Sequence, residues 1–169
     1  MCGKDRFRNL ALLSAGTLAG TLAGTEAASA EGRNGSEAPK KPNILFFLVD
    51  DLGWSDIGCF GSRFHETPNI DRLAEEGVRF TNAYAACHVS SPTRASLMTG
   101  RYPASIRLTD WLPGRKNWPF QRLLNAPVEQ HLPFEEITVA ETLRDNGYAT
   151  AIIGKWHLGK GDSNPLAHG

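Results

Sequence analysis

Two adjacent serines, Ser90 and Ser91, precede a Pro-Thr-Arg turn in the stretch HVSSPTRASLMTGRYP. Ser91 is a suitable N-cap and Pro92 a suitable first residue of a helix that stops at Gly100, so we expect Ser90 just before a helix N-terminus. Exposed N–H groups and the helix dipole stabilise an anion there, and Arg94 can add a charge-assisted hydrogen bond. These residues suit a nucleophile acting on an oxyanion ester, and they suit a plain helix cap equally well.

Two adjacent carboxylates, Asp50 and Asp51, follow the continuous apolar run at residues 44–49. Such a run is typical of a buried strand in a helix-covered sheet, and ligands bind beyond the carboxyl ends of these strands. Neighbouring carboxylates repel each other unless a cation or a proton relieves them, and calcium and magnesium prefer oxygen ligands. The pair therefore indicates either a divalent cation site or a solvated turn.

The segments around these residues alternate between helix and strand patterns. Pro68 predicts a helix start, and Gly77 is expected to close that helix in the left-handed conformation. A short strand is predicted at residues 78–86, before the serines. Thr138 and Glu141 form a predicted capping box, and Gly147 ends that helix before a buried strand at residues 148–153. The alternation predicts an α/β fold, a mixed and largely parallel sheet between helices.

The region between these two units, residues 104–136, is rich in proline and shows no sustained hydrophobic period. A long loop inside a compact domain is usually functional or poorly ordered. It is interpreted as a loop on the substrate side or, equally well, as an irregular cover over the core.

Composition and the N-terminus set the remaining limits. The 169 residues carry 18 basic and 18 acidic side chains, which gives no support to nucleic-acid binding. A basic start, a short apolar run and small residues near Ala30 predict a signal peptide at residues 1–30, rather than a membrane anchor, and hence a periplasmic or secreted protein. The signal peptide is followed by a predicted polar leader at residues 31–41 and by a single predicted domain at residues 42–169. A bridge between Cys59 and Cys87 stays open.

Three ordered motifs resemble the type I sulfatases, the formylglycine-dependent branch of the alkaline phosphatase superfamily. The segment SSPTRASLMTGR is similar to the family signature, in which Cys or Ser is followed by x-Pro-Ser/Thr-Arg and later by Thr-Gly-Arg. The segment PNILFFLVDDLGWSDIGCFG resembles the family's N-terminal metal strand, and GYATAIIGKWHLG resembles its Gly-Lys-Trp-His-Leu-Gly segment. Together they span Pro42 to Gly159.

The resemblance implies a sulfuric ester hydrolase and assigns a role to each matching residue. Ser90 would be oxidised to formylglycine by a serine-type maturation enzyme, and Arg94 would hold the hydrate of its aldehyde. Lys155 and His157 would contact the sulfate and the nucleophile; their spacing on an extended segment predicts that both lie on one side. Without the resemblance, His157 reads as a surface histidine. Asp50, Asp51 and the modified Ser90 would together bind a metal ion, either calcium or magnesium. Thr93 and Arg101 would be structural.

The family also requires a second metal pair and further His and Lys residues on later strands. We therefore expect the N-terminal part of a sulfatase catalytic domain, incomplete at its C-terminus and with half a metal site. The implied partners are a sulfated small molecule or glycan, with no nucleic acid and no membrane anchor. The alternatives are a catalytically inactive remnant and a related phosphate or phosphonate ester hydrolase.

Overall fold

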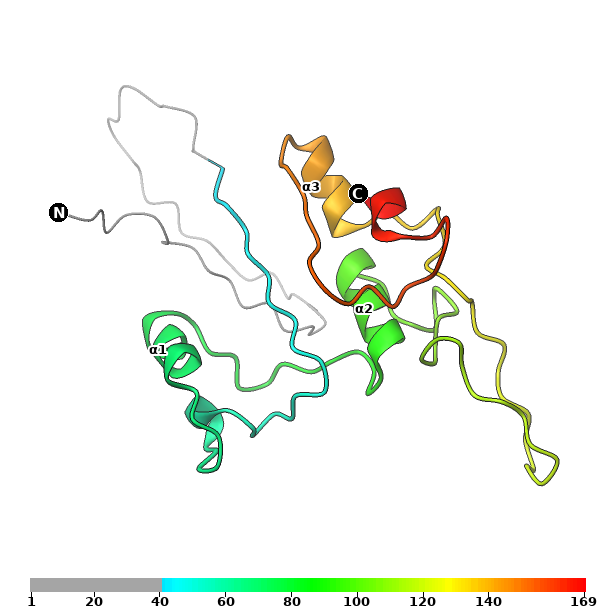
Figure 1. Ribbon diagram of the computed structural model, residues 1–169, viewed down its shortest axis with the longest axis horizontal. Coiled ribbons are helices and arrows are strands. Elements are labelled where there is room, and N and C mark those ends of the chain that lie inside the picture. The colour runs from blue at the N-terminus through cyan, green and yellow to red at the C-terminus, as the bar shows by residue number, and fades with distance from the viewer. Residues whose placement is uncertain (1–40) are drawn as a thin grey trace, which may run out of the picture. The chain divides into compact units, whose positions relative to one another are not determined.

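The computed structural model describes residues 41–169, which fall into two compact units (Figure 1). The first unit ends at Asn82, and the second covers Ala83–Gly169. The predicted signal peptide, and the leader up to residue 40, lie outside the described residues. Within residues 41–169, no helix is long and apolar enough to cross a membrane.

The first unit contains a short 3-10 helix, η1 (Gly58–Phe60), and one α-helix, α1 (Pro68–Glu76). The predicted start of α1 at Pro68 is confirmed. The Asp71 carboxylate joins the two helices, because it accepts a hydrogen bond from the Cys59 N–H at 2.7 Å and from the Thr67 hydroxyl at 3.1 Å. The predicted left-handed closure is wrong, since Gly77 has φ −119°.

None of the three segments predicted as strands pairs with another in the part of the chain that the structure describes. The apolar side chains of residues 44–49 are 39–68% exposed, so this run is not buried. Residues 78–86 and 148–153 likewise lie outside any ladder, and the Ile153 side chain is 98% exposed. A strand is stabilised by the hydrogen bonds of its neighbours, and no other segment among residues 41–169 supplies them.

The hydrophobic core lies entirely in the second unit, as far as the described residues go. Its buried members come from α2, from the segment after it and from the segment near the C-terminus, and are Ala95, Ile106, Leu108, Leu132 and Leu158. The side chains of Met98 and Trp156 pack against them. The Leu132 N–H donates to the Leu158 carbonyl at 2.8 Å, which ties the middle of the unit to the segment near its end.

The first helix of the second unit, α2 (Ser90–Thr99), starts two residues earlier than predicted. Val89 is the N-cap and Ser90 the first helical residue, so Ser91 is not the cap. The Ser91 hydroxyl is buried and instead accepts a hydrogen bond from the Leu112 N–H at 3.1 Å. The predicted stop is confirmed: Gly100 has φ 68°, and its N–H donates to the Ser96 carbonyl at 2.8 Å.

The last α-helix, α3 (Val139–Asp145), begins with the predicted capping box. The Glu141 N–H donates to the Thr138 hydroxyl at 3.1 Å, and the Thr138 N–H donates to the Glu141 carboxylate at 2.8 Å. This backbone hydrogen bond lowers the pKa of Glu141. The chain then closes with η2 (Pro165–His168), and the Thr138 hydroxyl also donates to the His168 carbonyl at 2.6 Å.

The imidazole of His168 is buried at the end of this unit. Its ring stacks on Phe134, with ring centroids 5.2 Å apart, and lies 5.6 Å from the Trp156 ring. Its Nε2 lies 3.2 Å from the Ser163 hydroxyl. Burial lowers the pKa of His168, since the surrounding apolar groups solvate the charged ring poorly. The His168 ring therefore packs the C-terminal turn against Phe134 and Trp156.

Candidate active site

The predicted nucleophile and its arginine lie one turn apart on α2. The Arg94 Nε donates to the Ser90 Oγ at 3.2 Å, so the guanidinium lies against the hydroxyl at the start of the helix. A second guanidinium nitrogen, Nη1, donates to the Lys155 carbonyl at 2.7 Å. Three of the predicted site residues therefore meet at the N-terminal turn of α2, although Lys155 meets the others through its backbone.

His157 takes part in a second connection to the same helix. Its Nε2 lies 2.9 Å from the Leu112 carbonyl, and the Leu112 N–H in turn donates to the Ser91 hydroxyl at 3.1 Å. The backbone of residues 155–157 is thus joined to the first turn of α2 both through Arg94 and through Leu112. The other ring nitrogen, Nδ1, is buried and has no hydrogen-bond partner in the described part of the chain.

Strand alternation does not bring Lys155 and His157 together, contrary to the prediction. His157 has φ 58°, in the left-handed region, so the segment is not regularly extended at that residue. Lys155 is exposed, whereas His157 is half-buried. What brings the two residues to the same helix is the pair of hydrogen bonds made by Arg94 and Leu112.

The residues expected to be structural hold the two ends of α2. The Thr93 hydroxyl donates to the Cys87 carbonyl at 2.7 Å, which closes the turn that leads into the helix. Beyond the helix, the Arg101 guanidinium forms an ion pair with the buried carboxylate of Glu136. The thiols of Cys59 and Cys87 are both free.

The two aspartates lie in the first unit, in a turn directly after residues 42–49. Both are exposed, and Asp51 has φ 55°. Adjacent carboxylates are suitable ligands for a hard cation, but calcium takes about six to eight oxygen ligands. Among residues 41–169 no group of three or more His, Cys, Asp or Glu side chains could hold a metal ion. The pair therefore fits part of a cation site and not a whole one.

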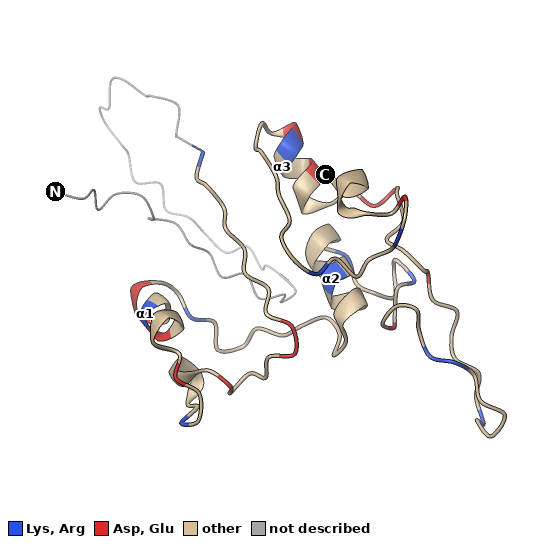
Figure 2. Ribbon diagram, viewed as in Figure 1, with Lys and Arg blue, Asp and Glu red and all other residues tan. Residues whose placement is uncertain are grey.

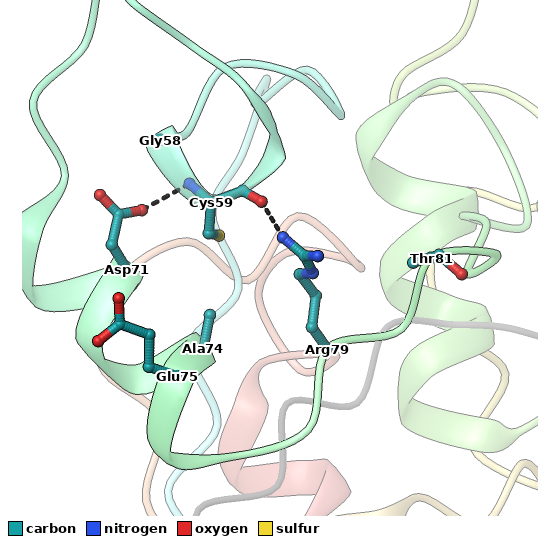
Figure 3. A pocket seen from close by; sticks show the side chains of 7 residues that line it. All are labelled: Gly58, Cys59, Asp71, Ala74, Glu75, Arg79 and Thr81. Carbon is teal, nitrogen blue, oxygen red and sulfur yellow. Dashed lines mark hydrogen bonds between the residues drawn. The ribbon is translucent and has the colours of Figure 1, made fainter.

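A cavity of about 700 Å³ in the first unit contains none of the predicted site residues. Figure 3 shows its lining: the Asp71 carboxylate is directed at the Cys59 N–H, and the Arg79 guanidinium donates to the Cys59 carbonyl. Arg79 also lies over the Phe60 ring, 5.3 Å from its centroid. These polar contacts join η1 to α1 and to the segment after it, so the cavity belongs to local structure.

Sequence reasoning missed two groups that organise the site, the Ser91 hydroxyl and the backbone of Leu112. The Ser-Ser pair is a weak signal for Ser91: if Ser90 is the nucleophile, the second serine must have a different role. Leu112 gave no signal, because its contribution comes from its N–H and carbonyl and not from its side chain.

Comparisons with known proteins agree with this arrangement. The family model described as Sulfatase matches residues 42–167. Steryl-sulfatase of Homo sapiens is 45% identical over 141 residues, which cover 79% of this chain and 23% of that protein. N-acetylgalactosamine-6-sulfatase of Canis lupus familiaris is 42% identical over 146 residues, which cover 83% of this chain and 26% of that protein.

Solved structures give the same result. The crystal structure of Ps i-CgsB matches with a TM-score of 0.65 and 38% identity, and the match covers 76% of this chain and 26% of that one. The structure of Ps i-CgsB in complex with k-i-k-neocarrahexaose matches with a TM-score of 0.59 and 39% identity, over 70% of this chain and 24% of that one.

The chain spans about a quarter of the length of the curated relatives it matches. The family and its solved members have an α/β fold of the alkaline phosphatase type, although residues 41–169 form no strand. The family model matches residues 42–167, and the structure joins the serine and arginine of α2 to the segment at residues 155–157. We conclude that this chain belongs to the Sulfatase family.

Proposed function

We propose that this chain carries the nucleophile half of a sulfuric ester hydrolase that acts through a formylglycine made from Ser90. The observation that carries this proposal is the hydrogen bond of 3.2 Å from the Arg94 Nε to the Ser90 Oγ, at the first turn of a helix in a chain of this family. When present, formylglycine supplies a hydrated aldehyde with one hydroxyl to attack sulfur and a second to expel the sulfate afterwards.

Arg94 would orient the group at position 90 and offset negative charge near it. Its guanidinium already makes two hydrogen bonds, to the Ser90 hydroxyl and to the Lys155 carbonyl, so its rotamer is fixed before any substrate binds. A preorganised cation stabilises developing negative charge without reorganising during the reaction. The N–H groups in the first turn of α2 add to the same field.

Lys155 and His157 would contact the sulfate and the nucleophile. Lys155 is exposed, and its ammonium group would bind an anionic sulfate. The Nε2 of His157 lies against the Leu112 carbonyl. Because a carbonyl can only accept a hydrogen bond, Nε2 carries the ring proton in the neutral tautomer. Its Nδ1 is then an acceptor, and it is buried without a hydrogen-bond partner in the described part of the chain.

Asp50 and Asp51 would supply two of the ligands of a calcium ion, with magnesium as the alternative, and the modified Ser90 a third. A bound divalent cation would polarise the sulfate oxygens as a Lewis acid. Because the His, Cys, Asp and Glu side chains of residues 41–169 form no cluster of three or more, the remaining oxygen ligands would be groups of another kind, such as carbonyls or water.

Sulfated glycans are the proposed substrate class, with a periplasmic or secreted location. Support comes from one relative, whose name describes a sulfatase of N-acetylgalactosamine, and from the signal peptide predicted at residues 1–30. The proposed maturation partner is a serine-type radical iron–sulfur oxidase. It would remove two hydrogens from the Ser90 side chain, as two electrons taken up by its own cofactors and two protons, and so turn the CH₂OH group into an aldehyde.

The first test is mass spectrometry of a tryptic digest of the protein from its natural host. We expect the peptide of residues 80–94 to be lighter by two hydrogens than the sequence requires. An intact serine at position 90 would contradict the proposal and favour an inactive remnant.

The second test uses the gene product as the host makes it, with a sulfate ester and the matching phosphate ester. We expect calcium-dependent release of sulfate, and we expect Arg94→Ala to abolish it. Arg107→Ala is the matched control and should retain activity, because Arg107 forms its ion pair with Glu129 at the surface. Activity on the phosphate ester alone would identify a related phosphate ester hydrolase instead.

A further inference from the structure

The loop after Leu112 concentrates aromatic and basic side chains in a chain that has no net charge. This arm, residues 111–125, includes Arg115, Lys116 and Arg122 and no aspartate, glutamate or histidine. Figure 2 shows the same segment as blue and tan along the arm that projects from the second unit. The acid that precedes the arm in the sequence, Asp110, pairs with Arg115 at 3.6 Å. The arm therefore presents positive charge to solvent.

The arm is ordered by its own hydrogen bonds. The Asn125 N–H donates to the Asn117 side-chain oxygen at 2.8 Å, and the Asn125 amide group donates to the Arg115 and Lys116 carbonyls, each at 3.2 Å. At the tip, the Gln121 N–H donates to the Trp118 carbonyl at 3.0 Å. These bonds close the two sides of the arm onto each other, and Figure 1 shows the two sides running next to each other.

A cavity of about 630 Å³ lies in this arm. Six of the residues that line it are Trp111, Arg115, Lys116, Trp118, Phe120 and Gln121. The Trp118 and Phe120 rings stack, with centroids 6.1 Å apart and planes at 15°, yet they remain 56% and 82% exposed. Flat aromatic faces bind the C–H faces of sugar rings, while cations and an amide bind their anionic and hydroxyl groups.

The base of the arm is also part of the site at α2. Leu112 donates its N–H to the Ser91 hydroxyl, and its carbonyl binds the His157 ring. Trp111 and Pro113, on either side of Leu112, both line the cavity of the arm. A ligand that lies in this cavity is therefore next to the segment that positions the proposed catalytic groups.

We propose that the arm at residues 111–125 binds the neighbouring sulfated sugar units of an oligosaccharide whose sulfate ester lies at α2. The inference rests on the proposed function and adds to it the substrate-recognition element. Stacking on Trp118 and Phe120 selects a sugar chain, and the charges of Arg115 and Lys116 select a sulfated one. A small aryl sulfate would not reach the arm.

The test is a titration of this chain with a chondroitin 6-sulfate hexasaccharide and with the chemically desulfated hexasaccharide, by calorimetry at low salt. We expect the sulfated form to bind at least tenfold more tightly, with affinity that falls as salt is added. Trp118→Ala and Lys116→Gln should each weaken its binding about tenfold. Trp54→Ala, which changes an exposed tryptophan of the first unit, should leave it unchanged. Circular dichroism checks that the variants fold.

Equal affinity for the two hexasaccharides, binding unaffected by Trp118→Ala, or no binding at all would overturn the inference. The outcome is independent of Ser90 chemistry. If the arm binds the sulfated hexasaccharide while Ser90 stays unmodified, the recognition element stands and the proposed function fails. If Ser90 is converted and sulfate is released but the arm variants bind as the parent does, only the inference fails.

Discussion

Each of the two units of this chain contains part of the predicted site, and the units differ in how far burial fixes the positions of these residues. In the second unit, Ser90 and Arg94 lie on a helix whose inner residues are buried against a small core. In the first unit, no side chain among residues 41–82 is buried, and Asp50 and Asp51 lie exposed in a turn. A nucleophile can thus be positioned by packing inside one unit, whereas the carboxylate pair is held by local geometry alone.

The difference has a physical cause in the kind of element that each predicted residue occupies. A helix satisfies its own backbone hydrogen bonds, so α2 needs only one buried face to be stable. A run such as residues 44–49 needs neighbouring strands on both edges before burial becomes favourable. The metal half of the site therefore depends on pairing partners that the helix does not need.

The largest expected effect is on the core of the second unit. Leu132→Ala removes a fully buried side chain, and we expect it to lower the free energy of unfolding by about 2–5 kcal/mol. Leu45→Ala, a matched change at a side chain that is 54% exposed, should change it by less than about 0.5 kcal/mol. Urea denaturation followed by tryptophan fluorescence measures both. Equal losses would show that the apolar run of the first unit is buried in solution.

A smaller effect is expected at the capping box of α3. Thr138→Ala removes the hydroxyl that accepts the Glu141 N–H, which should destabilise the helix by about 1 kcal/mol. Amide hydrogen exchange at residues 139–145 should accelerate about fivefold, since a change of this size corresponds to such a factor. Thr138→Ser keeps the hydroxyl and should restore protection. Thr67→Ala, at the start of α1, should leave α3 unchanged, and acceleration there would mean that the two units unfold together.

The smallest expected effect is a pH dependence confined to the second unit. Because burial lowers the pKa of His168, the unfolded chain takes up a proton at a higher pH than the folded chain does. Stability should therefore fall as the pH drops below the ordinary histidine value of about 6.5. Glu141, whose pKa is also lowered, should add a second loss as the pH falls through the ordinary glutamate range.

Urea midpoints measured between neutral and acidic pH test this dependence. His168→Gln should remove the step in the histidine range, while His88→Gln, at an exposed position, should retain it. A step that persists without His168 would assign the titration to another group, and the burial of this histidine would then not be its cause.

Local signals in the sequence predicted one end of each α-helix correctly. Pro68 marks the start of α1, Gly100 the end of α2, and Thr138 with Glu141 the start of α3. Each of these depends on hydrogen bonds or dihedral angles within a few residues, which a short stretch of chain determines by itself. The strand predictions failed in residues 41–169 because a strand is defined by partners elsewhere in the chain.

The sequence by itself determined the family, through the order and spacing of its three motifs, and the position of Ser90 one helical turn before Arg94. Tertiary structure alone decided that Arg94 also binds the Lys155 carbonyl and that the Leu112 backbone joins Ser91 to His157. The physical reason is distance along the chain. A contact one turn apart follows from helix periodicity, whereas contacts made by backbone groups between distant segments have no residue type that reveals them.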